Sequence, residues 1–184
     1  MHYVELFPGK FRWGNLMPSL VRFGGCTTVC AAAVLMMAGS AARAATATST
    51  MTVQMTITAT CTVNSATTLN FGTQGVLSTN VDQTSTIQVT CTNTTPYNIG
   101  LDAGTGTGAT VATRKMTSGA NTVNYTLYSN SGRTTVWGNT VGTDTQAATG
   151  NGSAQTYTVY GRVPSQAAPA PGTYSDTITI TVTY

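Results

Sequence analysis

The sequence predicts an all-β protein built as an antiparallel β-sandwich. Apolar residues recur with a period of two almost everywhere after residue 45, and the 3.6-residue period of an amphipathic helix is absent there. Threonine, which favours strands over helices, is abundant in the same region. Clusters of Gly, Asn, Ser and Pro separate the alternating runs, as is typical of short antiparallel strands.

Residues 1–44 have the pattern of a cleaved signal peptide. An apolar run at residues 29–42 follows several basic residues and is shorter than the ~20 residues of a membrane span. Small residues at the −3 and −1 positions fit cleavage after Ala44. We therefore expect export with no stable membrane insertion, an uncleaved anchor being the alternative. The long basic region leaves the start open between Met1 and Met17.

The composition of residues 45–184 argues against an enzyme and against a nucleic-acid partner. Four basic and four acidic residues cancel, which leaves no basic face for phosphates. The region contains no His and no Glu, the usual side chains of acid–base catalysis and metal binding. We expect no catalytic residue, no metal site and no cofactor. No hydrolytic pair is suggested by the spacing of the aspartates, Asp82, Asp102, Asp144 and Asp176.

The expected strands follow one another after the N-terminal run. A Gly-rich segment at residues 104–108 has no adjoining Lys or helix of the kind a phosphate loop needs, so we interpret it as a flexible turn. Residues 164–171 are a Pro/Ala connector before the last strand.

Each expected strand has one apolar face, formed in chain order by Ile87, Val89 and Cys91; Tyr97, Ile99 and Leu101; Val123, Tyr125 and Leu127; Tyr157, Val159, Gly161 and Val163; and Tyr174, Ile178, Ile180, Val182 and Tyr184.

Two cysteines, Cys61 and Cys91, remain after the expected cleavage. In an exported protein a lone pair is most simply a disulfide, and their spacing is too wide for a CxxC redox site. Closing this loop would stabilise the fold by roughly 3–4 kcal/mol in the chain-entropy model. We therefore assign the two cysteines a structural role.

The run at residues 45–61 is too long to lie within its own domain as one strand. Its odd positions are small or apolar, and its even positions are Thr except for Gln54. Fully extended, the run would measure about 56 Å, whereas a compact domain of this size is roughly 37 Å across. Either the run is disordered at its start or part of it pairs elsewhere, and we favour the second. Alternatively, residues 51–57 form the first strand of their own domain.

The last expected strand has an unprotected edge, which would complement a run that pairs outside its own domain. It ends at Tyr184 without a charge that would protect its edge. A sandwich that lacks its final strand exposes core beside such an edge, and a strand with alternating apolar side chains from another chain would fill the gap. This head-to-tail contact does not close on itself and would build a fibre. Burial would contribute roughly 6–12 kcal/mol as an upper bound from Met51, Val53, Met55 and Ile57.

Four short motifs occur in a fixed order along residues 45–184. They are Ala59-Thr60-Cys61-Thr62-Val63, Leu69-Asn70-Phe71-Gly72, Ile87-Gln88-Val89-Thr90-Cys91 and Gly172-Thr173-Tyr174-Ser175-Asp176-Thr177, before an alternating strand with an aromatic end. Together with the leader and the N-terminal run, they resemble the spore coat protein U domain family, whose best understood members are pilins of archaic (Csu-type) chaperone–usher pili. The resemblance implies an incomplete immunoglobulin-like fold that lacks its final strand and is completed by an N-terminal donor strand.

The resemblance also implies roles for parts of this chain. It divides the sequence into a signal peptide (1–44), a donor-strand extension (45–56) and a pilin domain (57–184). The residues that it assigns are Met51, Val53, Met55 and Ile57 in the donor strand, Cys61 and Cys91 in the disulfide, and Ile178, Ile180, Val182 and Tyr184 in one wall of the acceptor groove.

We expect a structural subunit of a secreted surface fibre that supports adhesion and biofilm formation. The implied partners are neighbouring pilin subunits, a periplasmic chaperone and an outer-membrane usher. A spore coat or extracellular matrix protein with the same domain is the first alternative. A tip adhesin is less favoured, because about 140 residues leave no space for a receptor-binding domain; Trp137 and Tyr128 could form a small binding patch, but such aromatics are more often core.

Overall fold

The computed structural model describes residues 43–184, and Thr52–Tyr184 form one compact unit. Both candidate start residues and the apolar run of the predicted signal peptide lie outside the described residues. Within residues 43–184 the regular elements are all strands, which confirms the predicted class. In that same range, no helix has the length and apolar character needed to cross a membrane.

Eight strands of 4 to 11 residues are present in the described part of the chain, most bounded by turns rich in Gly, Asn or Thr. In chain order they are β1 (Cys61–Ala66), β2 (Val81–Cys91), β3 (Pro96–Leu101), β4 (Arg114–Ser118), β5 (Asn121–Tyr128), β6 (Gln146–Thr149), β7 (Ala154–Val163) and β8 (Ile180–Thr183).

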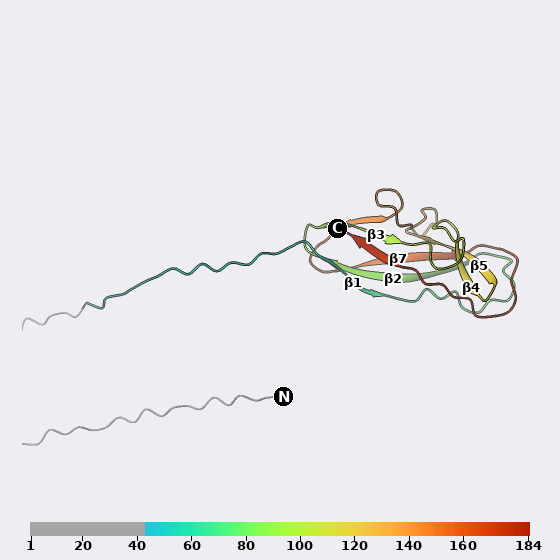
Figure 1. The fold of residues 1–184 in the computed structure, drawn as a ribbon, viewed down its shortest axis with the longest axis horizontal. Helices are drawn as coiled ribbons and strands as arrows, with labels where there is room; N and C mark the ends of the chain where they lie inside the picture. Colours follow the sequence, from blue (N-terminus) through green and yellow to red (C-terminus); the bar gives the residue numbers. More distant parts are fainter. Residues whose placement is uncertain (1–42) are drawn as a thin grey trace, which may run out of the picture. The chain divides into compact units, whose positions relative to one another are not determined.

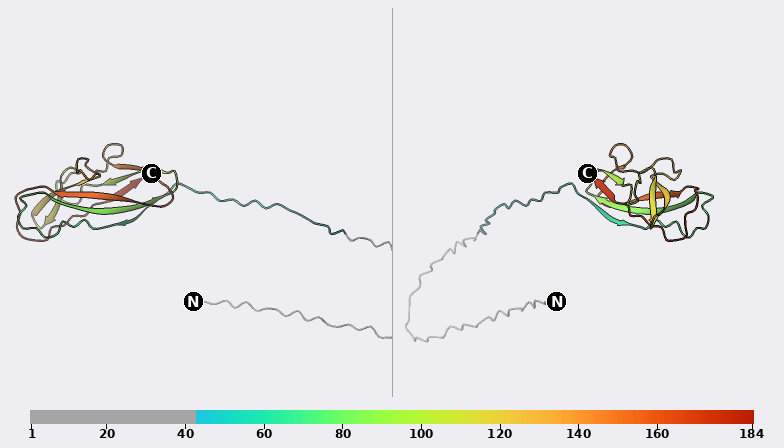
Figure 2. Two further views of the ribbon diagram at one scale, coloured as in Figure 1. Left: turned by 180° about the vertical axis from the view of Figure 1, so that it is seen from behind. Right: turned by 45° about the vertical axis from the view of Figure 1, so that its right-hand side comes forward.

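The strands form two antiparallel sheets. The larger has the order β1-β2-β7-β5-β4 and the smaller the order β6-β3-β8. The longest ladder joins β2 to β7, from Val81 opposite Val163 to Thr90 opposite Ala154. Figures 1 and 2 show β3, β6 and β8 over one end of these long strands, with β4 and β5 at the other end. The arrangement is the predicted sandwich, with β1 and β8 at the edges of different sheets.

The core lies between the sheets and is built from the apolar faces that the alternation predicts. Trp137 is 1 % exposed, so it belongs to the core and not to a surface binding patch. Its Nε1–H donates to the Ile99 carbonyl oxygen at 2.8 Å, which satisfies the buried donor. The other buried hydrophobic residues are Phe71, Leu77, Ile87, Val89, Cys91, Tyr97, Ile99, Leu101, Val123, Tyr125, Leu127, Val159 and Val163.

One cation, Arg114, is fully buried at the start of β4. Its guanidinium donates to four backbone carbonyl oxygens, those of Asp102 (2.7 Å), Val111 (2.8 Å), Leu101 (2.9 Å) and Trp137 (2.7 Å). Burial lowers the pKa of Arg114, and nearby negative charge partly offsets this effect. The side chain therefore joins the turns after β3 and before β4 to the Trp137 segment.

The last strand is shorter than the alternation predicts, beginning at Ile180 and not near Tyr174. Ser175 forms an isolated bridge with Thr117 of β4, whereas residues from Ile180 onward pair with β3. Because β4 and β3 belong to different sheets, residues 175–180 cross from one layer to the other. This crossing interrupts a strand that the sequence pattern predicts to be continuous.

Candidate subunit-binding groove

A groove of about 1220 Å³ separates two segments that are distant in sequence, residues 66–77 and residues 168–180. One wall therefore continues from β1, and the other leads into β8. The floor is the hydrophobic core itself, formed by Ile87, Leu101, Val123, Tyr125, Leu127, Val159 and Val163. The groove therefore opens onto the apolar core of the sandwich.

The two strands next to the groove each have one partner in the described sheets. β1 pairs with β2, and β8 pairs with β3 from Asn98 opposite Thr183 to Leu101 opposite Ile180. An edge strand presents a row of N–H and C=O groups on its open side. A further strand along β8 could accept and donate these bonds while its side chains cover the apolar floor.

The four residues predicted for the acceptor wall occupy different positions. Ile178 and Ile180 line the groove. Val182 is half-buried and packs against the core further along β8. Tyr184 follows the end of β8 and is 59 % exposed. The structure therefore brings two of the four residues to the groove, and their role in binding a strand stays a prediction.

The predicted donor residues lie before β1 in a segment without assigned secondary structure. Four large apolar side chains at alternate positions are exposed to water: Met51 is 85 % exposed, Val53 84 %, Met55 82 % and Ile57 72 %. A cluster of exposed apolar side chains of this kind usually marks an interaction segment. Their role as a donor strand stays a prediction.

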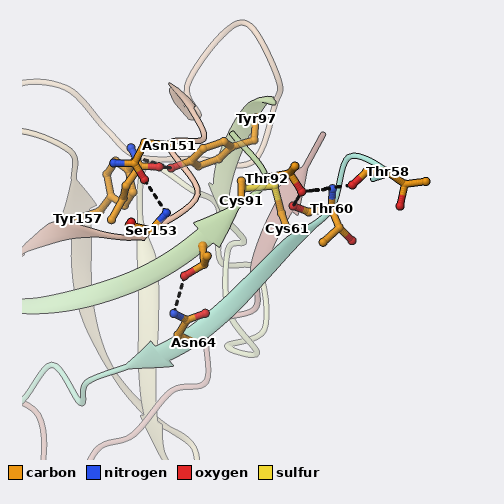
Figure 3. Close-up of a disulfide and its surroundings, with 12 residues drawn as sticks. Thr58, Thr60, Cys61, Asn64, Cys91, Thr92, Tyr97, Asn151, Ser153 and Tyr157 are labelled. Carbon is orange, nitrogen blue, oxygen red and sulfur yellow. Dashed lines mark hydrogen bonds between the residues drawn. A yellow bond between two sulfur atoms is a disulfide. The ribbon is translucent and has the colours of Figure 1, made fainter. Parts of the chain in front are cut away.

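The disulfide between Cys61 and Cys91 is present, as predicted (Figure 3). The two residues are directly opposite in the β1–β2 ladder, with their Cα atoms 4.1 Å apart. Since β1 is an edge strand, this covalent bond fastens the strand that leads into one wall of the groove.

Asp176 holds the other wall in place. Its Oδ1 accepts hydrogen bonds from the Thr105 N–H and hydroxyl, both at 2.8 Å, and its Oδ2 accepts one from the Tyr125 hydroxyl at 2.7 Å. Burial and the bond to Asp176 raise the pKa of Tyr125, which stays a neutral donor. Gly104 has φ +79°, and a Cβ there would come within 2.1 Å of the carboxylate. Bends and turns occupy residues 105–108, as predicted, and Gly104 and Thr105 at the start of this segment form a docking site for Asp176.

Asp102 fixes the start of β8. Its Oδ1 accepts hydrogen bonds from the backbone N–H groups of Thr179 at 2.9 Å and Gly104 at 3.0 Å. Burial of Asp102 opposes its charge, but the bonds from Thr179 and Gly104 and the charge of Arg114 outweigh burial and lower the pKa of this carboxyl. Sequence reasoning misses this anchor, because it joins residues 77 positions apart.

Replacement of Asp102 provides a pH-dependent prediction. A lowered pKa contributes stability that is present above the unfolded value near 4 and is lost as the pH falls through the folded value. We expect Asp102→Ala to cost about 2–4 kcal/mol of unfolding free energy at pH 7. Asp102→Asn should cost about 1 kcal/mol, because an amide oxygen can still accept both bonds. Urea unfolding between pH 7 and pH 3 should show a flatter pH profile for Asp102→Asn than for wild type; identical profiles would contradict this role.

Comparisons with known proteins show the family of the chain. A family model described as the Spore Coat Protein U domain matches residues 47–181. The chain belongs to the spore coat protein U domain family. Protein U of Myxococcus xanthus is 35 % identical over 168 residues, which cover 83 % of this chain and 93 % of Protein U.

A solved structure also resembles the chain. It is the CsuC–CsuE chaperone–tip adhesion subunit pre-assembly complex from the archaic chaperone–usher Csu pili of Acinetobacter baumannii. The two chains are 25 % identical with a TM-score of 0.51, over 70 % of this chain and 40 % of that one. This chain therefore spans less than half the length of its structural neighbour. The family and this structural neighbour support a surface protein of the pilus or spore-coat type.

Proposed function

We propose that this chain is a structural subunit of a surface fibre, and that its residues 45–56, extended through Ile57, fill the groove of the next copy. The proposal rests on two features of one chain, neither of which has a partner in the described structure. An apolar groove lies beside the edge strand β8, and an alternating segment exposes four large apolar side chains. Strand addition would remove both apolar surfaces from water.

The donor segment has the period that filling an apolar groove requires. Side chains at alternate positions of an extended strand point to one face, so the four donor side chains would all enter the groove. From Met51 to Ile57 such a strand spans about 20 Å, while its Thr and Gln positions would face away from the core. The contact would join the donor segment of one copy to the groove of the next. Because these are two different surfaces, the assembly would extend as a fibre and not close.

The proposed partners follow from the state of the groove before assembly. An open apolar groove would favour aggregation until a strand covers it. A periplasmic chaperone would prevent aggregation by lending a strand to the groove. An outer-membrane usher would then replace that strand with the donor strand of the next subunit. The likeness to a chaperone–subunit complex supports the chaperone. Adhesion and biofilm formation would then be properties of the assembled fibre.

The first experiment expresses the mature chain in the periplasm with its neighbouring chaperone and usher genes and compares unboiled and boiled samples on a denaturing gel. We expect a ladder at multiples of the monomer mass that collapses on boiling. Met51→Asp with Ile57→Asp should abolish the ladder, because two buried charges would enter the groove. The matched control, Thr52→Asp with Thr56→Asp, places equal charges on the opposite face and should keep it. A monomer band alone in the wild type would refute the proposal.

The similarity to Protein U favours a second candidate, a coat or matrix protein that uses the same domain without a chaperone and an usher. Expression of the mature chain without those two genes separates the candidates. A boiling-sensitive ladder that forms in their absence would support the coat or matrix protein, and dependence on both genes would support the pilus.

A further inference from the structure

The extension is tied to the domain at one residue, Thr92. Among residues 52–60, every hydrogen bond to the rest of the compact unit involves Thr92 (Figure 3). The Thr60 N–H donates to the Thr92 hydroxyl at 3.1 Å, and that hydroxyl lies 3.3 Å from the carbonyl oxygens of both Thr58 and Thr60. The Thr92 N–H donates to the Thr60 carbonyl oxygen at 2.9 Å.

This contact lies where the partner strand ends. β2 stops at Cys91, opposite Cys61, so the extension passes beyond the end of its neighbour. Side chains alternate along an extended chain, and a fixed backbone at Thr60 therefore fixes the direction in which Ile57 and its alternate neighbours point. The hydrogen bonds to Thr92 therefore hold the backbone at Thr58 and Thr60, directly after Ile57.

The turn that carries Thr92 is itself constrained. Thr94 has φ 64°, an unusual conformation for a β-branched residue. Its N–H donates to the Gly150 carbonyl oxygen, and the Gly150 N–H donates to the Thr95 carbonyl oxygen, both at 2.8 Å. A Cβ at Gly150 would come within 2.3 Å of the Thr92 carbonyl oxygen. Strained backbone that its surroundings hold in place is often found at functional positions.

We infer that Thr92 is the positioning residue of the joint between consecutive subunits, and that its hydroxyl sets the direction and stiffness with which the donor strand leaves the domain. The fibre part of this inference rests on the proposed function. Ile57 lies one residue before the tied segment, so a donor strand buried as far as Ile57 leaves almost no linker. The angle between two neighbouring subunits is then controlled at Thr58–Thr60.

The local part is tested by amide hydrogen exchange on the mature full-length chain, purified without the usher so that it is not polymerised. Thr92→Val keeps the shape of the side chain and removes the hydroxyl. We expect the Thr60 amide to exchange about tenfold faster, with Thr92→Ser restoring the wild-type rate. Thr90→Val, which removes a hydroxyl bound to Asn64 instead, is the matched control and should leave the rate unchanged. An unchanged rate in Thr92→Val would overturn the inference.

The fibre part is tested by the persistence length of assembled fibres in electron micrographs. Thr92→Val should keep the boiling-sensitive ladder and shorten the persistence length at least about twofold, since an exposed hydrogen-bonded tie of this kind limits local opening. Thr92→Val fibres as stiff as those of the wild type would contradict the role of Thr92 at the joint between subunits. Absence of fibres in the wild type would refute the proposed function. Hydrogen exchange would still test whether Thr92 holds the backbone at Thr60. If Thr92→Val does not fold, Thr92→Ala removes the same hydroxyl without a new methyl group and replaces it in both tests.

Discussion

A copy of residues 45–58 fused after Tyr184 through a short flexible linker is expected to raise the melting temperature of the mature chain by about 15–30 °C. The fused strand would turn back along β8, antiparallel to it, in the manner of a hairpin. It would place the copies of the four donor side chains over the groove floor. The expected gain follows from burial worth at most roughly 6–12 kcal/mol, which is reduced by the cost of ordering the strand.

The same fusion should also remove the unboiled ladder, because a groove filled from within its own chain cannot accept a neighbour. Two variants of the fused copy separate groove filling from a general effect of the added residues. Asp at the copies of Met51 and Ile57 should cancel the gain in melting temperature. Asp at the copies of Thr52 and Thr56 should retain it. Calorimetry that gives the same melting temperature with and without the fused strand would show that the groove is not a strand-binding site.

Much of this fold could be predicted from the sequence, because the sandwich is encoded by a local pattern. Alternation identifies the core faces of β2, β5 and β7, since one side of each strand is buried and the other is wet. The disulfide could be predicted from the two cysteines that remain after the predicted leader. The extension could be recognised because its alternation is longer than the domain can accommodate, and its apolar side chains are exposed in the structure.

The features that the sequence does not reveal are contacts between distant segments. Asp176 binds Thr105, 71 residues away, and Asp102 binds Thr179, 77 residues away. A bond from a side chain to a distant backbone group leaves no periodic trace, so alternation continues through residues 174–184 although the chain changes sheets there. Thr92 is hidden for another reason: it is one Thr among many, and its contact with Thr60 depends on where β2 ends.

Replacement of Arg114 is expected to cause the largest loss of stability of any single substitution considered. The guanidinium is buried and donates to four backbone carbonyl oxygens. A buried ion pair can often be replaced by apolar residues, because both partners are removed together. Here the acceptors belong to the main chain and stay in place after any substitution, so Arg114→Met leaves them without a donor. We expect a loss of about 3–5 kcal/mol.

Arg114→Lys tests whether charge or geometry matters. An ammonium group has three donors on one nitrogen and cannot reproduce a planar fork that reaches four separate oxygens. We therefore expect Lys to recover less than half of the loss, as measured by urea unfolding of the fused chain at pH 7.

The matched control is Arg162→Met, which removes a cation from the Asp82 ion pair on an exposed face. The Arg162 side chain is 29 % exposed, and such pairs contribute roughly 0–1 kcal/mol. Equal stability of the Arg114→Met and Arg162→Met variants would show that the four carbonyl groups find other donors or water. A large difference would show that this buried cation holds together the two turns beside the floor of the groove.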